Sequence, residues 1–194
     1  MHAMPKAQPS PRQQMHARLM ARAQGHPNDE AFAHMVASWA AGEGALPAWL
    51  GLSPARFREL FFRHFPGFAL DEISATRRHR QIPPERLPER QELEALLLRD
   101  RARGDPSEVW AAGLLAAGCL ADDHLWQDLG LWSRADLSQL LRHNFPALAA
   151  RNVKDMKWKK FLYKQLCETE GIYTCRAPSC EQCADYGQCF GPEA

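Results

Sequence analysis

The chain has 194 residues, of which 45% are hydrophobic and 24% are charged. These fractions are near those of globular proteins and exclude wholesale disorder, and the length suits one compact domain with a small appendage. Because 24 Lys and Arg residues stand against 23 Asp and Glu residues, the net charge of +1 favours neither nucleic acid nor a membrane as a partner. No stretch has the pattern of a membrane span or a signal peptide. We therefore expect a soluble, cytoplasmic protein.

Helix-start signals recur along the chain, whereas strand alternation is absent. Residues 1–14 are rich in Pro, Gln and small side chains and predict a flexible N-terminal arm. Helices are expected to begin at Asn28, Ser53-Pro54, Pro88, Asp105-Pro106, Ser133 and Asn152, with Gly104 ending the helix that Pro88 opens. The predicted fold is all-α, a single helical bundle over residues 15–170 followed by an irregular, cysteine-rich metal-binding tail over residues 171–194.

Two segments, residues 28–66 and 106–146, share one order of features: an apolar helix, a Leu-Gly-Leu link, a capping serine, a second helix and a Phe-Pro end. The matched positions are Leu50-Gly51-Leu52 with Leu129-Gly130-Leu131, Ser53 with Ser133, and Phe65-Pro66 with Phe145-Pro146. Trp132 is an insertion in the second copy. We interpret the pattern as a duplicated helix pair around which the bundle is built, with chance similarity of two amphipathic helices as the alternative.

A charged segment, residues 71–105, separates the two copies and contains Arg77-Arg78-His79-Arg80. This Arg77–Arg80 cluster could contact an anion or a partner, but a solvated linker is favoured. The histidines are scattered along the chain. His64 and His143 stand at predicted helix ends, where a partial positive charge would suit the helix dipole.

The cysteines are concentrated near the C-terminus, where Cys175, Cys180, Cys183 and Cys189 have the spacing C-x4-C-x2-C-x5-C. The first three match the spacing of the plant-type ferredoxin loop, and four thiolates this close in sequence can converge on one metal centre. A structural zinc site more often uses two C-x2-C pairs, and this motif has one. The spacing therefore favours an iron–sulfur cluster, with zinc, disulfides and unliganded thiols as alternatives.

Two further cysteines precede the motif. Cys167, eight residues before Cys175, could be an additional metal ligand or could pass an ion to the motif, although a buried structural role is commoner for such a cysteine. Cys119 lies within an apolar run and is expected only to pack.

A basic helix is expected from about residue 153 to residue 169. Its lysines are Lys154, Lys157, Lys159, Lys160 and Lys164, interleaved with aromatic and aliphatic residues. Lys157, Lys160 and Lys164 step by three and four residues and so share one helical face. That face could lower the cost of holding an anionic cluster or another anion, or could dock an acidic partner. The alternative is an ordinary solvated face of an amphipathic helix.

The segment from Met156 to Cys167, the four-cysteine motif and the closing Cys189-Phe190-Gly191-Pro192-Glu193 together resemble the NifQ family of nitrogen-fixation proteins. The resemblance implies an iron–sulfur cluster that incorporates molybdenum, or its iron–sulfur precursor, held by the four cysteines of the motif. It also implies that this cluster supplies molybdenum for synthesis of the iron–molybdenum cofactor of nitrogenase. The implied partners are the cofactor scaffold NifEN, the nitrogenase iron protein, and molybdate or another molybdenum source.

Two other classes of protein stay open. One is a zinc-stabilised interaction or nucleic-acid-binding module that uses the basic helix as its phosphate contact, and the other is a ferredoxin-like electron carrier. The sequence contains no Walker loop, no G-x-S-x-G, no H-E-x-x-H and no paired carboxylate motif. We therefore expect a carrier rather than an enzyme, and with the resemblance we expect neither nucleic acid nor a membrane as a partner.

Overall fold

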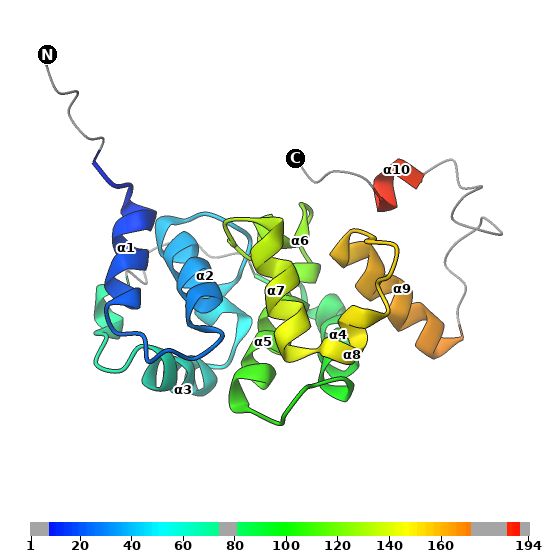
Figure 1. The fold of residues 1–194 in the computed structure, drawn as a ribbon, viewed down its shortest axis with the longest axis horizontal. Helices are drawn as coiled ribbons and strands as arrows, with labels where there is room; N and C mark the ends of the chain where they lie inside the picture. Colours follow the sequence, from blue (N-terminus) through cyan, green and yellow to red (C-terminus); the bar gives the residue numbers. More distant parts are fainter. Residues whose placement is uncertain (1–7, 74–80, 172–185, 191–194) are drawn as a thin grey trace, which may run out of the picture.

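The computed structural model describes residues 8–73, 81–171 and 186–190. Within these ranges the regular structure is helical and contains no strand, which confirms the all-α fold class (Figure 1). The Arg77–Arg80 cluster and three cysteines of the motif, Cys175, Cys180 and Cys183, lie outside the described residues. None of the described helices is both long enough and apolar enough to cross a bilayer.

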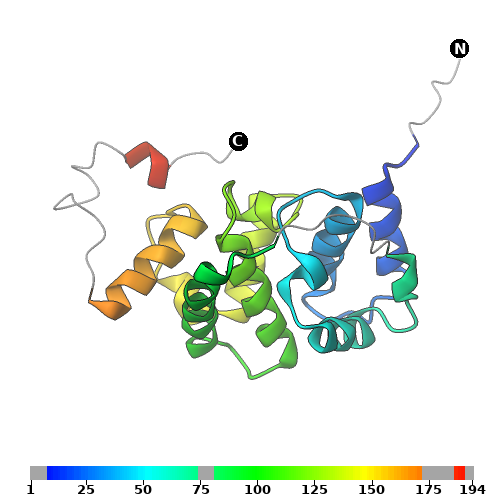
Figure 2. The same ribbon diagram turned by 180° about the vertical axis from the view of Figure 1, so that it is seen from behind.

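The elements follow one another along the chain, with η marking short 3-10 helices. They are α1 (Pro11–Met20), α2 (Asp29–Ala41), η1 (Ala48–Gly51), α3 (Pro54–His64), η2 (Leu70–Glu72), η3 (Pro84–Arg86), α4 (Leu87–Arg99), α5 (Pro106–Cys119), α6 (Leu125–Asp128), α7 (Arg134–Asn144), α8 (Pro146–Ala150), α9 (Trp158–Glu170) and α10 (Tyr186–Cys189). Figures 1 and 2 show α1, α2 and α3 at one end of the molecule, α4, α5 and α7 in the middle, and α9 at the other end.

The middle of the core is α5, whose residues from Trp110 to Cys119 are all buried. Its small side chains allow close packing by both Leu-Gly-Leu links. A Cβ on Gly113 would lie 2.9 Å from Leu52 Cδ2, and a Cβ on Gly118 would lie 2.8 Å from Leu129 Cδ2. The first leucine of one link and the last leucine of the other therefore pack on glycines of one central helix, which brings the two sequence copies onto a shared core.

The two copies have the same local geometry at their ends. The side chains of Ser53 and Ser133 each accept a hydrogen bond from a backbone N–H in the first turn of the next helix, as predicted. Phe65 has φ −135° and ψ 58°, and Phe145 has φ −135° and ψ 59°. Both phenylalanines are fully buried, so the Phe-Pro ends turn the chain in the same way and supply the same apolar contact.

The copies differ in the link between their helices. In the first copy, η1 contains Trp49 and Leu50 with left-handed backbone angles. In the second copy, the short helix α6 precedes Gly130, which has a φ of 72°. The hydroxyl of Ser38 in α2 donates to the carbonyl of Gly130 over 2.6 Å, and this bond ties the first copy to the link of the second.

Two predicted boundaries differ from the structure. The N-terminal arm was expected to extend to residue 14, but α1 begins at Pro11 because Ser10 and Gln13 form a reciprocal capping box. The helix opened by Pro88 was expected to run to Gly104, but α4 ends at Arg99. The N–H of Ala102 donates to Asn144, and the next two N–H groups donate to Glu108, so these groups are not available to continue the helix.

Candidate metal-binding site

The helix that precedes the cysteine motif, α9, begins at Trp158 rather than near Val153, where the Asn152 signal placed its start. Asn152 closes a turn instead, because its side chain accepts from the N–H of Met156 and donates to the carbonyl of Met156, each over 2.8 Å. Within this turn Asp155 has a left-handed φ of 51°. The Arg134 guanidinium, 2.9 Å away, lowers the pKa of the Asp155 carboxyl and holds the turn against α7.

The helix α9 is attached to the body through both apolar and polar contacts. The buried side chains of this helix are Trp158, Phe161, Leu162 and Leu166. The Trp158 indole donates to the hydroxyl of Ser138 in α7 over 2.9 Å. The Tyr163 hydroxyl donates to Glu89 in α4, and burial together with this carboxylate raises the pKa of Tyr163. These contacts fix α9 on the helical body, next to the segment that carries the cysteine motif.

The end of the cysteine motif contacts the N-terminal end of α9. The backbone N–H of Lys157, the N-cap of α9, donates to the carbonyl of Cys189 over 2.8 Å. The Lys157 ammonium donates to the carbonyl of Gly187 over 3.3 Å. Phe190, 5% exposed, is buried in the core beside them. Cys189 is thereby held, half-buried, at the N-terminal end of α9.

Positive charge lies near the backbone that carries Cys189. The N-terminus of α9 carries partial positive charge, and the Lys157 ammonium bonds to the carbonyl of Gly187, two residues before Cys189. A cysteine binds metal in its thiolate form. Of the four cysteines predicted to be ligands, Cys189 is the one that the described part of the chain contains.

Cys167 lies near the opposite end of α9. The rise along the helix from Lys157 to Cys167 is about 15 Å at 1.5 Å per residue. Metal–sulfur bonds are only about 2.3 Å long for zinc, so Cys167 and Cys189 cannot ligate one ion in this arrangement. Cys119 packs in the core as expected, and this burial raises the pKa of its thiol to about 12.

The lysines of the basic helix have different surroundings. Lys159 is built into the body, where its ammonium contacts Asp128 and donates to the carbonyls of Ala121 and Asp123. Of the three predicted docking residues, Lys157 contacts the tail, Lys160 is exposed, and Lys164 lies 3.6 Å from Glu168. Helical spacing placed these three on one face but could not predict that the tail returns to Lys157.

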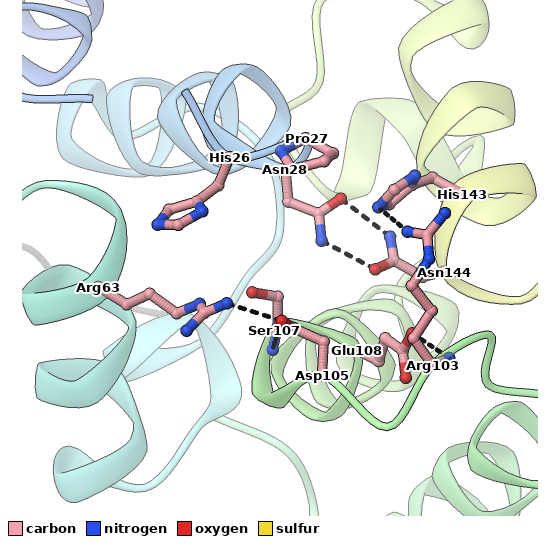
Figure 3. A pocket seen from close by; sticks show the side chains of 10 residues that line it. All are labelled: His26, Pro27, Asn28, Arg63, Arg103, Asp105, Ser107, Glu108, His143 and Asn144. Atoms are coloured by element: carbon pink, nitrogen blue, oxygen red, sulfur yellow. Dashed lines mark hydrogen bonds and ion pairs between the residues drawn. The ribbon is translucent and has the colours of Figure 1, made fainter. Parts of the chain in front are cut away.

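A second polar site, which the sequence did not indicate, lies between the two copies. It is a cavity of about 90 Å³ lined by His26, Pro27, Asn28, Arg63, Arg103, Asp105, Ser107, Glu108, His143 and Asn144 (Figure 3). Arg63 pairs with Asp105 over 2.7 Å, and the amides of Asn28 and Asn144 donate to each other over 2.8 and 3.0 Å. The polar groups of this cavity thus join helices of the two copies.

His64, behind this cavity, is fully buried. Its Nδ1 lies 2.6 Å from Asp29 Oδ1 and its Nε2 lies 2.9 Å from Ser107 Oγ. Burial lowers the pKa of His64. The pKa of His143 is also lowered, first by burial and then by the positive charge of Arg103. Burial thus acts against the positive charge that was expected for these residues at their helix ends. The two bonds of His64 connect the first turns of α2 and α5.

The described residues form a helical body, and the sequence near the C-terminus carries four closely spaced cysteines. The NifQ family profile matches residues 31–191. The chain is 48% identical to Protein NifQ of Azotobacter vinelandii over 169 residues, 82% of this chain and 86% of that protein. It is 40% identical to Protein NifQ of Rhodobacter capsulatus over 154 residues, 79% of this chain and 82% of that protein. It is also 40% identical to Protein NifQ of Klebsiella pneumoniae over 157 residues, 77% of this chain and 90% of that protein.

The chain belongs to the NifQ family, as the resemblance of its C-terminal segment predicted, and this is a family of nitrogen fixation. No solved structure matches it significantly.

Proposed function

We propose that this protein is a cytoplasmic carrier that supplies molybdenum for iron–molybdenum cofactor synthesis as a molybdenum–iron–sulfur cluster. Cys175, Cys180, Cys183 and Cys189 hold the cluster. The observation that best supports the proposal is the position of Cys189, which the backbone and side chain of Lys157 hold at the N-terminal end of α9. Membership of the NifQ family supports it as well.

The chemistry of this region fits such a cargo. Thiolates are soft ligands that suit iron–sulfur clusters. A thiolate-bound cluster is anionic, and the start of α9 together with the Lys157 ammonium lowers the electrostatic cost of holding it. An iron–sulfur precursor would be held first and molybdenum added from molybdate or another source. NifEN, working with the nitrogenase iron protein, would be the acceptor, and the protein acts in this scheme as a carrier and not as an enzyme.

The decisive experiment measures iron, molybdenum and zinc together in protein purified without oxygen. Serine variants of Cys175, Cys180, Cys183 and Cys189 should each lose most of both iron and molybdenum, while their helical circular dichroism equals that of the wild type. Cys119→Ser is the matched control, because its thiol is buried and protonated. Zinc alone in the wild type would identify a zinc-stabilised module, and reversible redox without molybdenum would identify an electron carrier. Either result would overturn the proposal.

Cys167 should have a graded effect. Because it lies about 15 Å along α9 from the residue that holds Cys189, Cys167→Ala should keep most of the iron. It should weaken retention or transfer of molybdenum if the thiol passes the ion to the motif. Metal content and delivery equal to those of the wild type would leave Cys167 as a packing residue.

The three lysines should separate cluster holding from partner docking. Lys157→Glu should lower cluster content, because it removes the ammonium beside the tail. Lys160→Glu should leave the content unchanged and slow delivery to the acceptor, in a manner that weakens with salt, since an exposed charge acts mainly on encounter. Lys164→Glu should have a weaker effect than Lys160→Glu, because Glu168 already lies beside Lys164. Delivery that is insensitive to all three changes and to salt would exclude docking by this face.

A further inference from the structure

A group of metal-ligating side chains lies at the other end of the molecule, between α1 and α2. His16 comes from α1, while Glu30 and His34 are one turn apart on α2. Glu30 Oε1 lies 3.0 Å from His16 Nε2 and 3.2 Å from His34 Nε2. The potential ligand atoms of all three residues lie within 4.8 Å of one another. Two imidazole nitrogens and one carboxylate oxygen therefore converge on one point.

Trp132, the residue inserted in the second copy, forms one wall of this group. The ring of His34 stacks on Trp132 with 4.2 Å between centroids, and the ring of His16 lies 4.7 Å from Trp132. The guanidinium of Arg12 lies over the same indole, 4.9 Å from its centroid, and pairs with Glu43. The insertion thus fixes the orientation of both imidazole rings.

The hydrogen bonding of the His34 ring is incomplete in the described part of the chain. Its side chain is 8% exposed and lies between two carboxylates, with Nε2 toward Glu30 and Nδ1 3.5 Å from Asp136 Oδ2. Among the described residues Nδ1 has no hydrogen-bond partner. A neutral imidazole has one N–H and can donate to only one of the two carboxylates.

We propose that His16, Glu30 and His34 bind one divalent first-row transition-metal ion, with Asp136 orienting the His34 ring from behind. The ion takes the place of the missing proton between Nε2 and Glu30, and the Nδ1–H then points toward Asp136. A carboxylate behind a ligating histidine is the usual outer partner of such sites, where it fixes the tautomer and raises the basicity of the ring.

The distances and charges agree with an ion of this kind. Bonds of about 2.0–2.1 Å in a tetrahedral zinc site separate ligand atoms by about 3.3–3.4 Å. The two separations from Glu30 are 3.0 and 3.2 Å, and all three ligand atoms lie within 4.8 Å of one another, so the side chains would draw together by a few tenths of an ångström around the ion. The two carboxylates, Glu30 and Asp136, together balance a charge of +2. Glu30 is 57% exposed, so water can complete the coordination and the ion can exchange. Imidazole and carboxylate ligands suit zinc, iron, cobalt and nickel.

This site does not depend on the proposed cluster. His16 and Glu30 precede residues 31–191, which the family profile matches, and none of the three ligands is a cysteine. Because α1 contributes one ligand and α2 contributes two, the bound ion would also clamp the first helix onto the body.

The experiment uses the full-length chain with Cys175, Cys180, Cys183 and Cys189 all changed to serine, so that the motif cannot bind the probe. Calorimetric titration with Zn²⁺ should give one equivalent, and Co²⁺ should give weak visible bands without thiolate charge transfer. Binding should raise the melting temperature. Asp136→Asn should weaken affinity roughly 10–100-fold, as for other outer partners, and His16→Ala and Glu30→Gln should weaken it further.

His143→Ala is the matched control, since it removes a half-buried histidine outside the site, and should bind Zn²⁺ with the parental affinity. His16 and Glu30 are partly exposed, so their variants should keep the parental helical content and test binding alone. The proposal is overturned if no equivalent of Zn²⁺ binds, or if His16→Ala and Glu30→Gln bind it as tightly as the parent chain.

Discussion

The two copies of the helix pair have the same ends but different polar residues inside. Immediately before the buried phenylalanine the first copy has His64 and the second has Asn144, and both are fully buried. His64 bonds to Asp29 and Ser107, whereas Asn144 pairs with Asn28. All of these partners lie at the start of α2 or α5.

The difference separates two roles within one pattern. The capping serines and the Phe-Pro ends are the same in both copies, because both copies need the same backbone path at these positions. Positions that reach across to the other copy differ, because each copy meets a different neighbour. Shared residues therefore set the backbone, and differing residues decide how the two copies pair.

The largest expected effect tests the shared ends. Phe65→Ala and Phe145→Ala should each lower the free energy of unfolding by about 3–5 kcal/mol, because each removes a fully buried ring. Urea denaturation checks both values. Phe62→Ala, at a side chain 83% exposed, is the control and should change stability by less than about 0.5 kcal/mol. A large loss in only one of the two copies would contradict the view that their ends are equivalent.

A smaller effect is expected at the two links. Gly51 and Gly130 have positive φ, and alanine there should cost about 1–2 kcal/mol for the backbone alone. A Cβ at Gly130 would lie 2.6 Å from Ser38 Cβ, and one at Gly51 would lie 2.8 Å from Ala117 Cβ. Gly104→Ala isolates the backbone cost, because its φ is 76° and no atom lies within 4 Å of the added Cβ. Both link variants should lose more stability in thermal or urea unfolding than this control. An equal loss in all three would show that the links tolerate the added methyl group.

The smallest effect distinguishes the polar residues of the two copies. The pKa of His64 is lowered from 6.5 in the folded chain, so the unfolded chain takes up the proton first as pH falls. Stability should therefore be greatest above pH 6.5 and fall below it, by at most about 1.4 kcal/mol per pH unit for one group. His64→Asn, which places the residue of the second copy in the first, should make urea unfolding between pH 7.5 and 5.5 less pH-dependent.

Part of this slope should remain in the variant, because burial also lowers the pKa of His34 and His143. Asn144→Ala should lower stability at every pH and leave the slope unchanged. A slope that is the same in His64→Asn and the wild type would show that His64 does not contribute.

Local signals predicted most of the fold correctly. Ser53, Asp105 and Ser133 cap the helices that they were expected to cap, because each bond joins residues two or three apart in sequence. Asn28 marks the start of α2, but its side chain does not cap it. It bonds to Asn144, which is 116 residues away, and no local pattern can predict that choice. The predicted start of α9 was also wrong because of a contact between residues distant in sequence. Arg134 of α7 pairs with Asp155 and so holds the turn that precedes α9.

The candidate sites, too, depend on contacts between distant residues that local sequence patterns do not predict. The cysteine spacing located the C-terminal motif, whereas the return of Cys189 to Lys157 required the structure. The histidine site was missed because residues 15–27 gave no helix-start signal, so the place of His16 opposite α2 could not be predicted. The available sequence signals for this site were the spacing of four residues between Glu30 and His34 on an expected helix, and the insertion of Trp132. Their convergence depends on α1, α2 and the second link together.

The return of the tail to α9 also bears on the entropy of metal binding. Gly171 caps the end of α9, and Lys157 together with the burial of Phe190 holds the chain again at Gly187 and Cys189. Cys175, Cys180 and Cys183 thus occur in sequence between two points that the folded body already fixes. Folding of the body therefore already includes the entropy lost in bringing the two ends of this segment together. In the proposed carrier, that entropy would not be lost again when a cluster binds.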